Sequence, residues 1–211
     1  MCVVSSVKVT RVSVYQAGTL VTCSLWCPGI IVAMAMKALA ALTYDDLQDF
    51  PDDGYRRELV HGQLLVSAAP VPKHQRAVMN LAYLLKAACP SHLEILPAPC
   101  DWAVSDDTVL EPDLVVIRRE HVGPRRIEGT PLLIVEVLSP STRDTDCTLK
   151  RHEYEQASVP AYWLVDPDVP SLTVLSLDNG IYTEAARVEG NEPYDAKWPY
   201  QVTITPLDLV S

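Results

Sequence analysis

Residues 132–142 read LLIVEVLSPST, and this stretch decides the fold. The residues on both sides of Glu136 form an apolar run of strand length that is half β-branched, and the run shows no alternation with polar side chains. That pattern is typical of a strand buried on both faces of a sheet. An ionised carboxylate in such a strand is costly unless it is paired or coordinates a metal. The stretch therefore predicts a central strand with a functional acid at Glu136.

The composition indicates a globular protein that does not coat nucleic acid. The chain has 211 residues, 48% of them hydrophobic, and a net charge of −10. Binding nucleic acid by bulk electrostatics needs an excess of Lys and Arg, so any nucleic-acid site must be local. The six cysteines form no CxxC pair, which disfavours a disulfide framework or a zinc site. We expect reduced thiols and a cytoplasmic location.

The amino-terminal segment differs in charge from the rest of the chain. Residues 1–33 contain Lys8 and Arg11 but none of the 27 acidic side chains. We therefore expect residues 1–33 to be an extension outside the fold and residues 34–211 to form one domain. No stretch reaches the roughly 18 to 20 uninterrupted apolar residues that a membrane span requires, so we expect no membrane insertion.

Helix and strand signals interleave from Thr43 onward without a strict βαβ rhythm. This order predicts a mixed sheet covered by helices, in the α/β or α+β class. Periodicity and turn residues predict a helix start at 43–50, a hairpin at 55–70, a helix at 72–89, strands at 92–97, 101–105, 113–118 and 131–138, a helix at 147–157, a strand at 161–167 and a hairpin at 172–187.

Two further acids occupy settings like that of Glu136. Asp113 precedes the strand LVVI, and Glu58 lies inside YRRELVHG. Taken singly, each could be an ordinary strand-edge or solvent-facing acid. Together the three carboxylates are the hard oxygen ligands that Mg²⁺ prefers, and the main-chain carbonyl of Val137 could supply another. Such an ion stabilises charge on a scissile phosphate.

A lysine on the following helix could complete this chemistry. Asp146, Lys150 and Tyr154 are spaced i, i+4 and i+8, so they share one helix face. Lys150 could orient the attacking water or neutralise developing negative charge. The alternative is an ordinary surface pair between Asp146 and Lys150.

The chain from about Leu39 to Leu209 closely resembles the Uma-type family of putative restriction endonucleases in the PD-(D/E)xK nuclease superfamily. The stretches that carry the resemblance are YRRELVHGQLLVSAAPVPKHQ, VLEPDLVVI, LLIVEVLSPST, DCTLKRHEYEQASVPAYWLVDP and PYQVTITPLDL. The resemblance implies a restriction-endonuclease-like core, a mixed sheet flanked by helices with the acids at one edge.

The resemblance also implies roles for individual residues. It puts Asp113 and Glu136 in the two acidic roles and matches Glu58 to the acid of the family's first strand. The superfamily lysine normally follows the second acid by two positions, where this chain has Leu138. Lys150 is the natural replacement. His74 also matches a family position, although a capping role at the start of its helix would explain it equally well.

Two hypotheses from different classes follow. The first is a Mg²⁺-dependent DNA endonuclease, with Mn²⁺ as a substitute, that acts as a C2 homodimer because cutting both strands needs two sites. The second is a catalytically weak nucleic-acid-binding or interaction module on the same fold. The negative charge favours the second slightly, and the intact set of acids favours the first. Glycoside hydrolysis by two carboxylates ranks last, because only 7% of the residues are aromatic.

Overall fold

The computed structural model describes residues 11–16, 19–24 and 41–211. The chain divides into two units, Met1–Leu42 and Thr43–Ser211. In the first unit β1 (Arg11–Gln16) and β2 (Thr19–Ser24) pair antiparallel. The domain boundary expected after residue 33 lies outside the described residues and stays a prediction.

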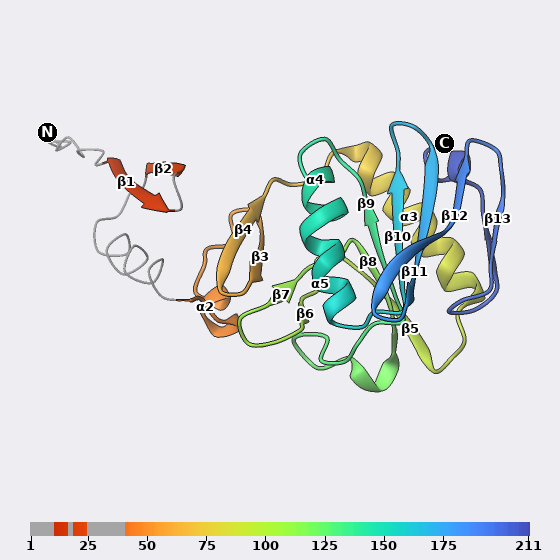
Figure 1. Cartoon of the computed structure of the whole chain (residues 1–211), viewed down its shortest axis with the longest axis horizontal. Helices are drawn as coiled ribbons and strands as arrows, with labels where there is room; N and C mark the ends of the chain where they lie inside the picture. Colours follow the sequence, from red (N-terminus) through yellow and green to blue (C-terminus); the bar gives the residue numbers. More distant parts are fainter. Residues whose placement is uncertain (1–10, 17–18, 25–40) are drawn as a thin grey trace, which may run out of the picture. The chain divides into compact units, whose positions relative to one another are not determined.

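The second unit is built on a six-stranded mixed sheet with the strand order β12-β11-β10-β9-β8-β5 (Figure 1). Strands β9 and β10 are parallel, and the other neighbours are antiparallel. The expected mixed sheet is confirmed. Its strands are β5 (Leu93–Pro97), β8 (Leu114–Arg118), β9 (Leu133–Val137), β10 (Ala161–Asp166), β11 (Ser171–Asp178) and β12 (Ile181–Glu189).

A smaller antiparallel sheet has the order β4-β3-β7-β6. Its strands are β3 (Arg56–Val60), β4 (Gln63–Ser67), β6 (Trp102–Ala103) and β7 (Val109–Leu110). The predicted turn at His61 and Gly62 is confirmed, since both residues have positive φ angles of 50° and 73°. The strand predicted at 101–105 is shorter in the structure, where β6 contains two residues. A hairpin of β13 (Tyr194–Ala196) and β14 (Val202–Ile204) was not expected from the sequence.

Helices cover both faces of the large sheet (Figure 1). The sequence predicts a helix only from residue 147, but the helical segment begins at Arg143. It also contains a π-helical turn, a feature that is frequent at functional sites. The helical elements are α2 (Tyr44–Gln48), α3 (Pro72–Ala88), α4 (Arg143–Thr145), the π-helical turn (Asp146–Lys150), α5 (Arg151–Gln156) and the 3₁₀ turns Arg119–His121 and Pro206–Leu209.

The pleat of β9 decides where Glu136 points. Val135 and Val137 pack in the core that includes residues of α3, whereas Ile134 and Leu138 pack in the core that includes Tyr154 of α5. Successive side chains of a strand alternate between the two faces. Glu136 therefore points toward α5 and the π-helical turn.

Candidate active site

The register of β8 and β9 brings Asp113 and Glu136 together. Leu114 is paired with Val135, so one step further along both antiparallel strands Asp113 lies opposite Glu136. The Asp113 amide donates to Glu136 Oε2 at 3.3 Å, and the Val137 amide donates to Asp113 Oδ2 at 2.8 Å. Asp113 and Glu136 are only 2% and 1% exposed. The sheet therefore holds two carboxylates side by side in the protein interior.

Asp113 is held in its ionised form. His74 Nε2 lies 2.9 Å from Asp113 Oδ2, and Arg56 Nη2 donates to Asp113 Oδ1 at 2.9 Å. Burial acts to raise the pKa of Asp113, but the His74 hydrogen bond and the Arg56 charge outweigh it and hold the pKa well below the usual range. His74 is itself buried, and its Nδ1 has no hydrogen-bond partner within the part of the chain that the structure describes.

Glu136 has the opposite electrostatic setting. Its Oε1 accepts hydrogen bonds from Lys150 Nζ at 3.1 Å and from the Tyr154 hydroxyl at 2.6 Å. Burial raises the pKa of Glu136 well above the usual range, and the Asp113 charge adds to this against the opposing charge of Lys150. Neighbouring carboxylates whose pKa values are pushed apart are a common feature of catalytic sites.

Lys150 joins Glu136 to the smaller sheet. Its Nζ lies 2.9 Å from Glu58 Oε1 and 3.8 Å from Asp146 Oδ1, and its side chain is 3% exposed. Burial acts to lower the pKa of Lys150, but the surrounding carboxylates raise it above its usual value, so the ammonium group stays charged. Burial raises the pKa of Asp146 to about 6. The structure thus brings Asp146, Lys150 and Tyr154 to one site. The i, i+4, i+8 prediction assumed a regular α-helix, whereas residues Asp146–Lys150 form a π-helical turn.

In this cluster the carboxylates of Glu58, Asp113, Glu136 and Asp146 pair with Lys150 and Arg56, and Asp113 also pairs with His74. Glu58 contacts Lys150 and accepts a hydrogen bond from the Glu111 amide at 2.8 Å. Among the described residues, no group of three or more His, Cys, Asp or Glu side chains forms a ready-made metal cage. Mg²⁺ needs only one or two carboxylates, because it keeps several waters. The carboxylates of Asp113 and Glu136, which lie at opposite positions of the β8–β9 register, fit that requirement by their chemistry.

Sequence reasoning missed Arg56 and Glu111. Arg56 Nε lies 2.8 Å from Glu111 Oε1, while the other end of the guanidinium bonds Asp113. Arg56 precedes Glu58 by two residues, so both lie on one face of β3. This period of two was the signal that could have found Arg56. Glu111, outside a regular strand, gave no periodic signal.

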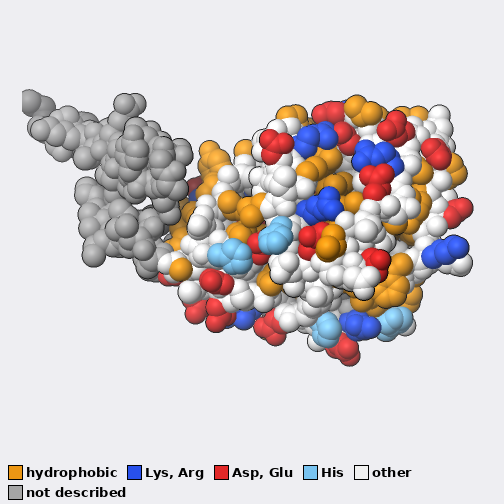
Figure 2. All heavy atoms as spheres, viewed as in Figure 1, with side chains coloured by type: hydrophobic (Ala, Val, Ile, Leu, Met, Phe, Trp, Pro, Cys, Tyr) orange, Lys and Arg blue, Asp and Glu red, His pale blue; other side chains and the backbone are white. Residues whose placement is uncertain are grey.

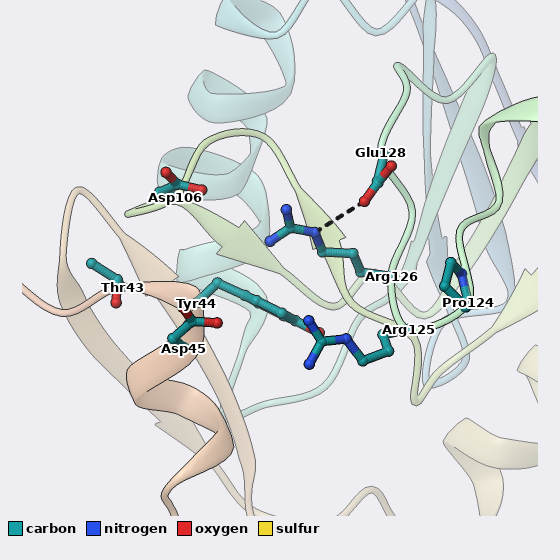
Figure 3. A pocket seen from close by; sticks show the side chains of 8 residues that line it. All are labelled: Thr43, Tyr44, Asp45, Asp106, Pro124, Arg125, Arg126 and Glu128. Atoms are coloured by element: carbon teal, nitrogen blue, oxygen red, sulfur yellow. Dashed lines mark ion pairs between the residues drawn. The ribbon is translucent and has the colours of Figure 1, made fainter.

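Two cavities lie near the smaller sheet. One, of about 250 Å³, is lined in part by Arg57, Asp101 and Glu111, so it reaches the Arg56 partner Glu111. The other, of about 340 Å³, contains none of the buried carboxylates (Figure 3). There the Arg126 guanidinium lies 4.5 Å from the centre of the Tyr44 ring, and its Nε lies 3.5 Å from Glu128 Oε1. Of these two cavities, the first is the one lined by a residue bonded to Arg56.

The surface charge is mixed. On the face drawn in Figure 2, acidic and basic side chains are interspersed rather than gathered into one broad basic patch.

Of the helices in the described ranges, none is both long and apolar enough to cross a membrane.

Comparisons with known proteins agree with this architecture. The model of a family described as "Uma2: Putative restriction endonuclease" matches residues 43–198. A crystal structure of a "putative nuclease belonging to DUF820" from Anabaena variabilis ATCC 29413 is similar to the chain with a TM-score of 0.60 and 18% sequence identity. The match covers 80% of this chain and 97% of that one, and at this identity it shows a shared fold. No curated protein matches the chain.

Proposed function

The chain belongs to the Uma2 family of putative restriction endonucleases, and from this premise we propose that it is a Mg²⁺-dependent endonuclease that hydrolyses phosphodiester bonds in DNA. The observation that carries the proposal is the buried juxtaposition of Asp113 and Glu136, with Lys150 bonded to Glu136. Buried carboxylates are expensive for stability. In this cluster the carboxylates outnumber Lys150 and Arg56, and a site for an additional cation requires such an excess of negative groups.

The metal would be held by Asp113, Glu136 and the main-chain carbonyl of Val137, with Glu58 as a further carboxylate close by. Mn²⁺ would substitute for Mg²⁺. When bound, the ion would lower the pKa of a coordinated water and stabilise charge on the scissile phosphate.

The surrounding side chains would position this centre. Lys150 would orient the attacking water and offset negative charge that develops on the phosphate. Tyr154 fixes the Glu136 carboxylate through its 2.6 Å hydrogen bond. His74 holds Asp113, and Asp146 adds a carboxylate 3.8 Å from the Lys150 ammonium group.

The substrate would be DNA bound at a local site. The net charge of −10 and the mixed surface in Figure 2 disfavour a broad electrostatic interface. Cutting both strands of a duplex by one type of site favours a C2 homodimer.

One observation favours the second candidate, a binding module without strong catalysis. Each of the carboxylates of Asp113, Glu136 and Glu58 already has a cationic side chain of the protein as a partner. A site that had lost its metal would be expected to close in this way. Cleavage measurements separate the two candidates.

The test is cleavage of supercoiled plasmid with Mg²⁺, Mn²⁺ or EDTA. The wild type should cut with either ion, and Asp113→Asn and Glu136→Gln should abolish cutting. Lys150→Ala should lower the rate by roughly 10²-fold, the scale of losing one positioned electrostatic group. Asp168→Asn is the matched control, because Asp168 is an exposed acid paired with Lys73 at 2.9 Å. DNA binding without cleavage under any metal condition would favour the binding module.

A further inference from the structure

The Arg56 guanidinium contacts Asp113 directly. Its guanidinium joins Asp113 Oδ1 at 2.9 Å to Glu111 Oε1 at 2.8 Å, and its side chain is 16% exposed. Arginine stays charged at any physiological pH. Asp113 therefore carries a permanent positive partner that differs from Lys150, the partner of Glu136.

The remaining hydrogen-bonding capacity of Asp113 is nearly used. Oδ2 accepts from the Val137 amide at 2.8 Å and lies 2.9 Å from His74 Nε2, while Oδ1 is bonded to Arg56. A carboxylate offers about four lone-pair sites in total. An incoming divalent cation would have to approach Oδ1 beside the guanidinium, where the two positive charges repel.

We propose that Arg56 is an internal counter-ion that competes with the divalent metal for Asp113 and so sets the metal affinity of the site. This inference rests on the proposed function. In the metal-free protein Arg56 neutralises Asp113. When a divalent cation binds, the Nη2–Oδ1 contact is exchanged for the metal contact, and Arg56 remains in the protein through Glu111.

The position of Glu111 makes this exchange feasible without unfolding β3. The Arg56–Glu111 contact uses Nε, whereas the Arg56–Asp113 contact uses Nη2, so one can break while the other stays. The guanidinium thus keeps one partner when its contact with Asp113 breaks.

The expected size of the effect follows from the electrostatics of neighbouring charges. An opposite charge within about 4 to 6 Å shifts the proton affinity of a carboxylate by about 1 to 3 pKa units, which is at least tenfold. A metal ion competes with Arg56 for the same oxygen as a proton would. Removing the Arg56 charge should therefore tighten metal binding by about tenfold or more.

The experiment is a Mn²⁺ titration of the full chain, with free Mn²⁺ followed by its electron paramagnetic resonance signal. Arg56→Gln should lower the Mn²⁺ dissociation constant by about tenfold. Arg56→Lys keeps the charge but cannot span Asp113 and Glu111 as the planar guanidinium does, so it should bind with an intermediate affinity. Arg119→Gln is the control with the same charge change, because Arg119 is an exposed residue that pairs with Glu94 beyond the far end of β8.

The outcomes separate the inference from the proposed function. If the wild type binds Mn²⁺ and Asp113→Asn abolishes binding, but Arg56→Gln binds no more tightly than the wild type, the inference is overturned and the metal site stands. If neither the wild type nor Arg56→Gln binds Mn²⁺, both are overturned. Should Arg56→Gln fail to fold, as judged by circular dichroism, the affinity of Arg56→Lys decides: a value equal to or weaker than that of the wild type overturns the inference.

Discussion

Removing an acid from the buried cluster should affect stability far less than removing its lysine. In Glu136→Gln, Lys150 keeps Glu58 at 2.9 Å and Asp146 at 3.8 Å, so the ammonium group is not left alone. In Lys150→Met, Glu136, Glu58 and Asp146 all lose the same cation. The excess of carboxylates over cations therefore predicts an asymmetry between the two substitutions.

The magnitudes follow from the individual contacts. In Glu136→Gln the amide oxygen of the new side chain can still accept from Lys150 and Tyr154, but its NH₂ group would face the Asp113 amide that donates to Glu136 Oε2 at 3.3 Å. An unsatisfied buried donor costs about 1–3 kcal/mol. Burial already disfavours the ionised form of Glu136, and removing this carboxylate offsets a similar amount, so the net loss should not exceed about 1 kcal/mol. Lys150→Met leaves buried charges uncompensated and should cost about 3–5 kcal/mol.

The assay is equilibrium unfolding in urea without metal, followed by circular dichroism for the wild type and both variants. The expected result is a near-unchanged midpoint for Glu136→Gln and a much lower midpoint for Lys150→Met, with similar slopes. A loss of about 3 kcal/mol or more in Glu136→Gln, the scale of breaking a buried ion pair, would refute the reasoning. It would mean that Glu136 and Lys150 form a balanced structural pair and that the site has no carboxylate in excess.

Three other outcomes are expected. Asp166→Asn should lower the free energy of unfolding by about 1 kcal/mol at neutral pH. Burial acts to raise the pKa of Asp166, but the 2.6 Å hydrogen bond from Arg143 and two backbone amide donors outweigh burial and lower that pKa. This stabilisation is present above the unfolded-state pKa of about 4 and is lost as the pH falls, so urea titrations should show wild type and variant converging in acid. Leu81→Ala should cost about 2–5 kcal/mol in the same assay, because Leu81 is fully buried between α3 and the sheet. Deleting residues 1–33 should leave the urea midpoint of Thr43–Ser211 unchanged, and a large decrease would make the extension part of the fold.

The central strand and its acid could be predicted because local sequence determines them. An apolar run of strand length has few alternatives to burial, and an acid within it has few explanations. The hairpin turn at His61 and Gly62 and the long helix α3 were equally local. These elements were confirmed with their boundaries within a few residues.

The partners of the acids could not be predicted with the same certainty, because they depend on register and packing. Arg56 and Asp113 are 57 residues apart, and their contact depends on how the smaller sheet packs beside β8. Exposed His61 and buried Glu153 are 92 residues apart in the sequence, yet His61 Nε2 lies 3.2 Å from Glu153 Oε1. The π-helical turn was missed because a single widened turn leaves no periodic signal in the sequence. The same limit applies to the short β13 and β14.

The most direct test of the proposed metal centre is the position of Mn²⁺ in crystals of the full chain, located by anomalous scattering. We expect a peak at about 2.0–2.2 Å from carboxylate oxygens of both Asp113 and Glu136, with Arg56 Nη2 moved off Asp113 Oδ1. A well-occupied Mn²⁺ elsewhere, or no peak between these carboxylates at saturating Mn²⁺ with Arg56 and Lys150 still bonded to them, would contradict the metal-dependent mechanism.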